Sequence, residues 1–166
     1  IFAGEVPTFE EAGRLIDLYS VDQAVMDALP ETRKGRELQQ TLRRGRLLLA
    51  YYSKQKTGTK DRKFFEVDRK QNVINVDRTR TIDSMYAQFI SASLGETGNT
   101  LPANAREIRD YYAHLKAPER KIIKDAMGID VAVYIESGPD HYAHAETYCH
   151  LASLVSAGSM IDYLKH

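Results

Sequence analysis

Two short apolar runs separated by a helix-like segment constrain the fold of this chain most strongly. The first run, DQAVMDALP at residues 22–30, ends as a strand at Asp27, and the second, RLLLAYY at residues 46–52, is too short for a buried helix. The segment between them, ETRKGRELQQTLRR, has the polar face of a surface helix and stops at Gly45. The order strand, helix, strand predicts parallel pairing through a right-handed crossover, and hence an α/β fold.

Local patterns predict the remaining elements. IFAGEV alternates like a strand, and TFEEAGRLIDLY is a helix that opens with a capping box of Thr8 and Glu11. KFFEVD and VINVDRTR, separated by RKQN, predict a β-hairpin. We expect helices at TIDSMYAQFI, AREIRDYYAHLKA and PERKIIKDAMG, a loop at GETGNTLPAN, a strand at VAVYIES, and a closing helix at GPDHYAHAETYCHLASLVSA.

Length and composition predict one soluble domain. The chain has 166 residues, 43% of them apolar and 28% charged, so we expect a single globular domain over residues 1–166. Its first residues carry neither a starting Met nor a signal peptide, and we expect the domain to be a piece of a longer chain. The lone cysteine, Cys149, excludes an internal disulfide and fits a reducing compartment. No apolar run reaches the roughly 18 residues that span a bilayer.

Two acidic residues follow predicted strands. Asp27 comes where a buried strand ends, and Asp140 follows VAVYIES at the start of the closing helix. Each has a purely structural alternative, because Asp27 suits a cap for the helix beginning near Glu31 and Asp140 suits an N-cap. Ligands gather at the carboxyl ends of strands in open α/β sheets. Taken together, the two carboxylates predict a shared site for Mg²⁺ or Mn²⁺.

Histidines accompany the second acid. His144 is four residues after Asp140 and lies on the same helix face, whereas His141 points elsewhere. An imidazole at this position can bind metal, position water or carry a proton, and it can equally be a polar residue at the edge of the core. The chain has no HExxH motif and only one cysteine, so it carries no zinc signature.

Basic residues concentrate in one arm of the chain, from Lys54 to Arg80. The chain as a whole is neutral, with 23 basic and 23 acidic residues. Such a run is usually a solvated surface, but its concentration in one arm suits contact with a phosphate backbone. Few aromatic residues accompany it, which favours duplex DNA over single strands. The predicted DNA-binding residues are Lys54, Lys56, Lys60, Arg62, Lys63, Arg78 and Arg80.

Four stretches resemble one family when they are read in order. These are VMDALPETRKGRELQ, RLLLAYYSKQ, VINVDRTRTIDSMYAQ and GPDHYAHAETYCHLA. Together they resemble the C-terminal nuclease domain of the large terminase subunit of tailed bacteriophages, from about Val21 to Ala152.

The resemblance implies an RNase H-like mixed sheet of five strands, flanked by helices, with an inserted β-hairpin. It implies a metal-dependent endonuclease that cuts concatemeric double-stranded viral DNA, with a cluster of acids holding Mg²⁺ or Mn²⁺. Asp27 would be the second acid and Asp140 the last, with His144 beside it as a further catalytic residue, either a supporting ligand or a water-positioning group. The implied partners are double-stranded DNA, an N-terminal packaging ATPase domain, the small terminase subunit and the portal protein. The implied location is the cytoplasm of the infected bacterial host.

The chain departs from this family at its start. The family's first acid lies on a strand upstream of IFAGEV, and no residue before Asp27 takes its place, because Glu10, Glu11 and Asp17 belong to a predicted helix and Glu5 to a different strand. The GxxxxGK[ST] loop of the packaging ATPase is also not found. We therefore expect the chain by itself to cleave DNA poorly or not at all, and better when extended upstream through an Asp-bearing strand.

Two other functions stay open at this point. A non-catalytic DNA-clamping or docking domain of the packaging motor would keep the fold with an incomplete acid cluster. Another RNase H-like enzyme, such as a junction resolvase, would prefer branched DNA.

Overall fold

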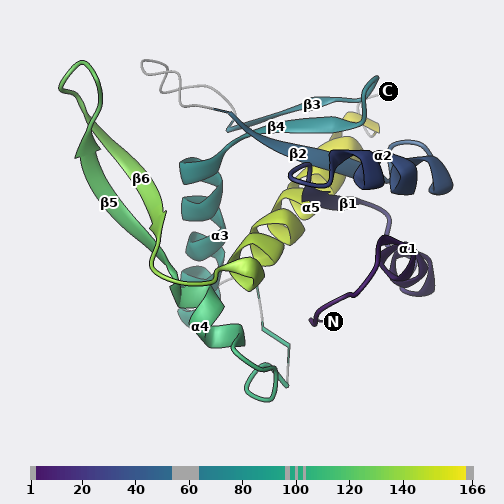
Figure 1. Ribbon diagram of the computed structural model, residues 1–166, viewed down its shortest axis with the longest axis horizontal. Coiled ribbons are helices and arrows are strands. Elements are labelled where there is room, and N and C mark those ends of the chain that lie inside the picture. Colours follow the sequence, from purple (N-terminus) through teal and green to yellow (C-terminus); the bar gives the residue numbers. More distant parts are fainter. Residues whose placement is uncertain (1–2, 54–63, 96–97, 100, 103, 164–166) are drawn as a thin grey trace. The chain divides into compact units, whose positions relative to one another are not determined.

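The computed structural model divides into two compact units, which are described separately (Figure 1). The described residues are 3–53, 64–95, 98–99, 101–102 and 104–163. The sheet unit comprises those within 5–77 and 148–166, and the hairpin unit comprises those within 1–4 and 78–147. The helix α5 (His141–Tyr163) begins in the hairpin unit and continues into the sheet unit.

The sheet unit contains a mixed four-stranded sheet. Its elements are α1 (Phe9–Leu18), β1 (Ala24–Asp27), α2 (Thr32–Thr41), β2 (Leu47–Ser53), β3 (Phe65–Asp68), β4 (Val73–Asp77) and the later turns of α5. The strand order is β1-β2-β4-β3. β1 and β4 both pair with β2 in parallel, and β3 pairs with β4 antiparallel. The predicted α/β class, the parallel β1–α2–β2 crossover and the β3–β4 hairpin are confirmed.

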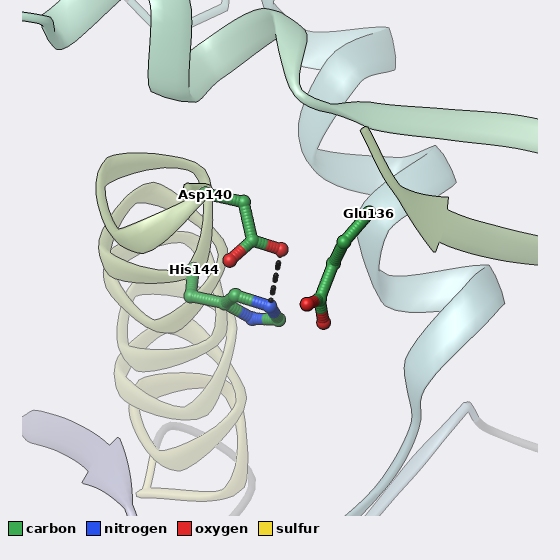
Figure 2. A group of neighbouring side chains, drawn as sticks. All are labelled: Glu136, Asp140 and His144. Carbon is green, nitrogen blue, oxygen red and sulfur yellow. Dashed lines mark ion pairs between the residues drawn. The ribbon is translucent and has the colours of Figure 1, made fainter. Parts of the chain in front are cut away.

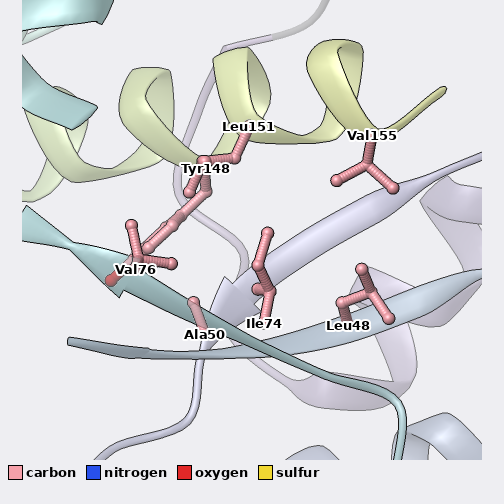
Figure 3. Close-up of a cluster of buried hydrophobic side chains, with 7 residues drawn as sticks. All are labelled: Leu48, Ala50, Ile74, Val76, Tyr148, Leu151 and Val155. Atoms are coloured by element: carbon pink, nitrogen blue, oxygen red, sulfur yellow. The ribbon is translucent and has the colours of Figure 1, made fainter. Parts of the chain in front are cut away.

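Both faces of this sheet are covered by helices. Successive residues of a strand point to opposite faces, so Leu48 and Ala50 lie on the face covered by α5, where they pack with Tyr148 and Leu151 (Figure 3). Leu47 packs on the other face against α1 and α2. This double burial explains why β2 reads as a continuous apolar run.

The sheet unit also keeps one predicted cap. The backbone N–H of Glu11 donates to the Thr8 hydroxyl at 3.2 Å, as the capping box requires. The return contact differs from the prediction, because the Glu11 carboxylate pairs with Arg14 instead. Only half of the capping box is therefore present.

The hairpin unit combines a two-stranded ribbon with helices. Its elements are α3 (Arg78–Ser93), α4 (Tyr111–Lys116), β5 (Pro118–Lys124), β6 (Asp130–Glu136) and the first turns of α5. β5 and β6 are antiparallel over their whole length, from the Pro118–Glu136 pair to the Lys124–Asp130 pair. Tyr134 of β6 packs against Ile82 and Met85 of α3, which anchors the ribbon to that helix.

The prediction of a helix at PERKIIKDAMG is wrong, because this segment is β5 and the turn that follows it. The turn is organised by Asp125, whose Oδ1 accepts hydrogen bonds from the backbone N–H groups of Met127 and Ile129 at 2.8 and 2.9 Å. Gly128 takes a left-handed φ of 76°, which glycine adopts without steric cost. Pairing with β6 therefore overrides the helix-like charge pattern of this segment.

Four smaller predictions need correction. Residues 3–6 of IFAGEV form no strand, and the end of VINVDRTR is helical because α3 begins at Arg78. α4 is shorter than the helix predicted for AREIRDYYAHLKA. Within the described residues the main sheet has four strands instead of five, since β6 pairs with β5 in a separate sheet. None of the helices in the described part of the chain is long and apolar enough to cross a membrane.

Candidate metal centre

Three potential metal ligands meet in the hairpin unit. Glu136 is the last residue of β6, Asp140 directly precedes α5, and His144 lies one turn into that helix. One carboxylate oxygen of each acid and one imidazole nitrogen all lie within 4.8 Å of one another. Figure 2 shows Glu136 directed toward the other two side chains. The cluster therefore joins the end of a strand to the start of a helix.

Local structure explains why these residues converge. The backbone N–H of His144 donates to the Asp140 carbonyl at 3.1 Å, which sets both side chains on one helix face. The turn between β6 and α5 is held by Ser137, whose N–H and hydroxyl both donate to the Ala117 carbonyl, at 3.0 and 2.8 Å. This anchor fixes the chain immediately after Glu136.

Asp140 has the most unusual environment in the cluster. The residue is only 6% exposed, and its Oδ2 accepts no hydrogen bond from the described residues. This oxygen lies 3.0 Å from Nε2 of His144, which is an ion-pair distance without the orientation of a hydrogen bond. A buried carboxylate oxygen is costly to leave unsatisfied. It is therefore an acceptor directed at a place where a cation can bind.

An arginine also faces the cluster. Nη2 of Arg78 lies 3.3 Å from Oε1 of Glu136, 3.9 Å from Oδ2 of Asp140 and 3.5 Å from Nε2 of His144. Its Nη1 donates to the Tyr134 carbonyl at 2.9 Å, which fixes the guanidinium on β6. The positive charge of Arg78 offsets the charge of the two carboxylates.

The negative charge of Asp140 affects the pKa of a neighbouring phenol, Tyr86. Burial raises the pKa of Tyr86, and the negative charge of Asp140 raises it further. The Tyr86 hydroxyl donates to the Leu115 carbonyl at 2.7 Å, so this phenol stays a neutral donor. The carboxylate of Asp140 is therefore close enough to affect a side chain of α3.

Two of the predicted site residues are brought together, and one further ligand was not predicted. Asp140 and His144 lie in the cluster, while His141 is exposed and lies against His114, as expected for a residue on another face. Glu136 was not predicted, and the signal that could have found it is its place at the end of the strand predicted for VAVYIES. Arg78 was predicted to bind DNA, and in this structure it contacts the acids.

Asp27 lies in the sheet unit with both carboxylate oxygens engaged. Its Oδ1 accepts from the Leu29 N–H at 2.9 Å and its Oδ2 accepts from the Tyr148 hydroxyl at 2.8 Å. Burial raises the pKa of Tyr148, and Tyr52 and Asp27 raise it further, so Tyr148 remains the donor. The helix cap proposed for Asp27 is not formed, because α2 starts at an N-cap of Glu31. A cation shared by Asp27 and Asp140 stays a prediction.

The basic arm is only partly described. Arg80 is half-buried on α3. The predicted DNA-binding residues outside the described residues are Lys54, Lys56, Lys60, Arg62 and Lys63. Their contact with DNA stays a prediction.

Comparison with known protein families, curated proteins and solved structures gives no match for this chain.

Proposed function

We propose that this chain is the nuclease domain of a viral DNA-packaging terminase, a divalent-metal-dependent endonuclease that acts on double-stranded DNA. The observation that carries the proposal is the Glu136, Asp140 and His144 cluster, with a buried Asp140 oxygen that accepts no hydrogen bond from the described residues. The mixed sheet and the ordered resemblance to terminase nucleases support an RNase H-like domain.

The donor set suits a hard divalent cation. Two carboxylates match Mg²⁺ and Mn²⁺, and an imidazole nitrogen as third ligand favours Mn²⁺ over Mg²⁺. Glu136, Asp140 and His144 are the residues that would hold it. When bound, such an ion would stabilise the attacking water and the leaving oxygen in a displacement at phosphorus.

The other predicted site residues have separate proposed roles. Asp140, buried and anchored at the start of α5, fixes where the cation binds. His144 is less buried and its Nε2 faces the same space, so it can bind the cation or hold a proton of the incoming water. Asp27 remains a predicted ligand. The cluster in the hairpin unit consists of Glu136, Asp140 and His144 and does not include it. The predicted basic residues would hold the DNA backbone.

A plasmid-nicking assay tests this function. Wild-type protein with Mn²⁺ should nick supercoiled DNA, slowly and in a way that EDTA stops. Glu136→Gln should slow nicking by roughly 10–100-fold or more. Loss of a residue that only orients a metal ligand already costs that much, and Glu136 is itself a proposed ligand. The matched control is Glu119→Gln on β5, because Glu119 pairs with Lys121 at 3.5 Å and does not belong to the cluster. Equal nicking by wild type and Glu136→Gln would refute the proposal.

The contact between Arg78 and Glu136 favours a second candidate, a non-catalytic DNA-clamping or docking domain. An arginine that neutralises the acids gives the cluster a structural role without any metal. Such a domain would bind duplex DNA with the same affinity in EDTA and in Mn²⁺, and it would not nick. An electrophoretic mobility shift under both conditions, run beside the nicking assay, distinguishes the two candidates.

A further inference from the structure

We propose that Arg78 occupies the cation position of the acid cluster, and that a divalent metal binds there only by displacing its guanidinium group. This inference concerns the regulation of the site and rests on the proposed metal-binding function. It makes Arg78 a resident counter-ion that sets the metal concentration at which the site fills.

The guanidinium of Arg78 lies beside the atoms that a metal would bind. Nη2 of Arg78 lies within 3.9 Å of a ligand atom of each member of the cluster. The three ligand atoms lie within 4.8 Å of one another. A metal at roughly 2.0–2.6 Å from Oε1 of Glu136, which lies 3.3 Å from Nη2, would come within about 6 Å of the guanidinium. Two positive charges repel at such a separation, so a bound metal would disfavour the present position of Arg78.

The position of Arg78 in its helix supports a dedicated role. Arg78 is the first residue of α3, where the helix dipole disfavours a positive charge. Its bonds run instead to β6, with Nη1 donating to the Tyr134 carbonyl at 2.9 Å and Nη2 to Glu136 at 3.3 Å. The acid cluster therefore offsets the unfavourable helix position. Displacement of the guanidinium breaks its hydrogen bonds to the Tyr134 carbonyl and to Glu136.

Asp140 supplies an independent sign that the place is built for a cation. The guanidinium lies at 3.9 Å from Oδ2, and that oxygen, although buried, accepts no hydrogen bond from the described residues. Arg78 thus neutralises Asp140 only at a distance. A small ion that coordinates Oδ2 directly would satisfy an oxygen that Arg78 leaves without a hydrogen bond.

Isothermal titration calorimetry with Mn²⁺ tests the competition on the whole chain. Arg78→Gln should bind Mn²⁺ roughly 10–100-fold more tightly than wild type. In this variant the charged hydrogen bonds of the guanidinium to Tyr134 and Glu136 no longer have to be broken before the ion binds. The matched control is Arg120→Gln, which removes the same charge from an ion pair with Asp83 at 2.9 Å elsewhere in the hairpin unit. Its Mn²⁺ affinity should equal that of wild type. In the double variant Arg78→Gln, Glu136→Gln the gain should disappear.

Equal or weaker Mn²⁺ binding by Arg78→Gln would overturn the inference, as would an equal gain in Arg120→Gln.

A second measurement uses unmutated protein, in case Arg78→Gln does not fold. The side-chain ¹⁵N–H resonances of Arg78 should shift on titration with Mg²⁺ while those of Arg120 do not, and an unchanged Arg78 signal at saturation would overturn the displacement. Tighter binding by Arg78→Gln without any DNA nicking would support the displacement and refute only the nuclease function. Loss of nicking alone therefore cannot be mistaken for failure of this inference.

Discussion

At the residue scale, the two predicted acidic ligands have different surroundings. Asp27 is exposed and each of its oxygens accepts a hydrogen bond, from the Leu29 N–H and from the Tyr148 hydroxyl. Asp140 is buried, and its Oδ2 accepts none from the described residues. An unsatisfied buried acceptor costs roughly 1–3 kcal/mol, and more when it is charged. Arg78 lies only at ion-pair distance from this oxygen, so Asp140 is the carboxylate that a bound cation would stabilise most.

His150 gives a pH prediction at this scale. It is buried on α5, and burial lowers the pKa of its imidazole below the usual 6.5. The unfolded chain therefore binds this proton more readily than the folded chain does near pH 6.5. The free energy of unfolding should fall as the pH drops below this value, by at most about 1.4 kcal/mol per pH unit, and should not depend on His150 above it.

Urea unfolding between about pH 7.5 and pH 5.5, on either side of the ordinary histidine pKa, measures this effect. His150→Gln should show a shallower decline than wild type over this range. The control is His141→Gln, which removes an exposed histidine from the same helix. Parallel curves for wild type and His150→Gln would contradict the prediction.

At the element scale, the β5–β6 ribbon carries Glu136 to the cluster. Within the described residues this sheet has two strands, and such a pair is marginally stable unless it packs on another element. Tyr134 supplies that packing, because its ring lies against α3 and its hydroxyl donates to Asp83 at 2.8 Å. Thr79 adds a bond from its hydroxyl to the Ala132 carbonyl at 3.3 Å. The start of α3 and the end of β6 are therefore held together, and with them Arg78 and Glu136.

The ribbon turn offers a test of this element. Gly128→Ala places a Cβ on a residue with a φ of 76°, and the left-handed conformation should cost about 1 kcal/mol. Amide hydrogen exchange in β5 and β6 should then speed up about fivefold, while β1 and β2 keep their protection. The control is Gly138→Ala, because Gly138 has no positive φ and open space around its Cβ position. Unchanged exchange in β5 and β6 would show that the turn does not limit the ribbon's stability.

At the scale of the whole molecule, charge distribution matters more than net charge. The chain has 23 basic and 23 acidic residues, so long-range attraction to DNA must come from local concentration of positive charge. The segment from Lys54 to Lys63 has five basic residues and one acid, Asp61. It remains the strongest sequence candidate for contact with the DNA backbone.

Replacement of Lys60, Arg62 and Lys63 by Gln should weaken duplex binding for all sequences. Three lost phosphate contacts should reduce the slope of log affinity against log salt by roughly 3, because fewer counterions are released on binding. Fluorescence anisotropy at several salt concentrations measures this slope. The control replaces three exposed basic residues elsewhere, Arg33, Arg109 and Lys121, and changes the net charge equally. Equal slopes for the two triple variants would contradict a specific role of the arm.

The sequence by itself determined the elements whose patterns are local. The apolar run of β2, the turn between β3 and β4 and the apolar spacing of α5 each lie within a few residues, and each was predicted correctly. The same reasoning found Asp140 and His144, because four residues along a helix place two side chains on one face. It would also have found Glu136 if the rule of acids at strand ends had been applied to VAVYIES.

Only the tertiary structure decided the features that depend on distant contacts. PERKIIK has the charge pattern of a helix, and its pairing with β6 made it a strand. Arg78 reads as one more basic residue of the arm, yet its partners Glu136 and His144 lie 58 and 66 positions further along the chain. No local pattern encodes such a meeting, because it requires α3, β6 and α5 to pack first. Packing therefore decided that Arg78 lies beside the acids of the candidate metal centre, while its contact with DNA stays a prediction.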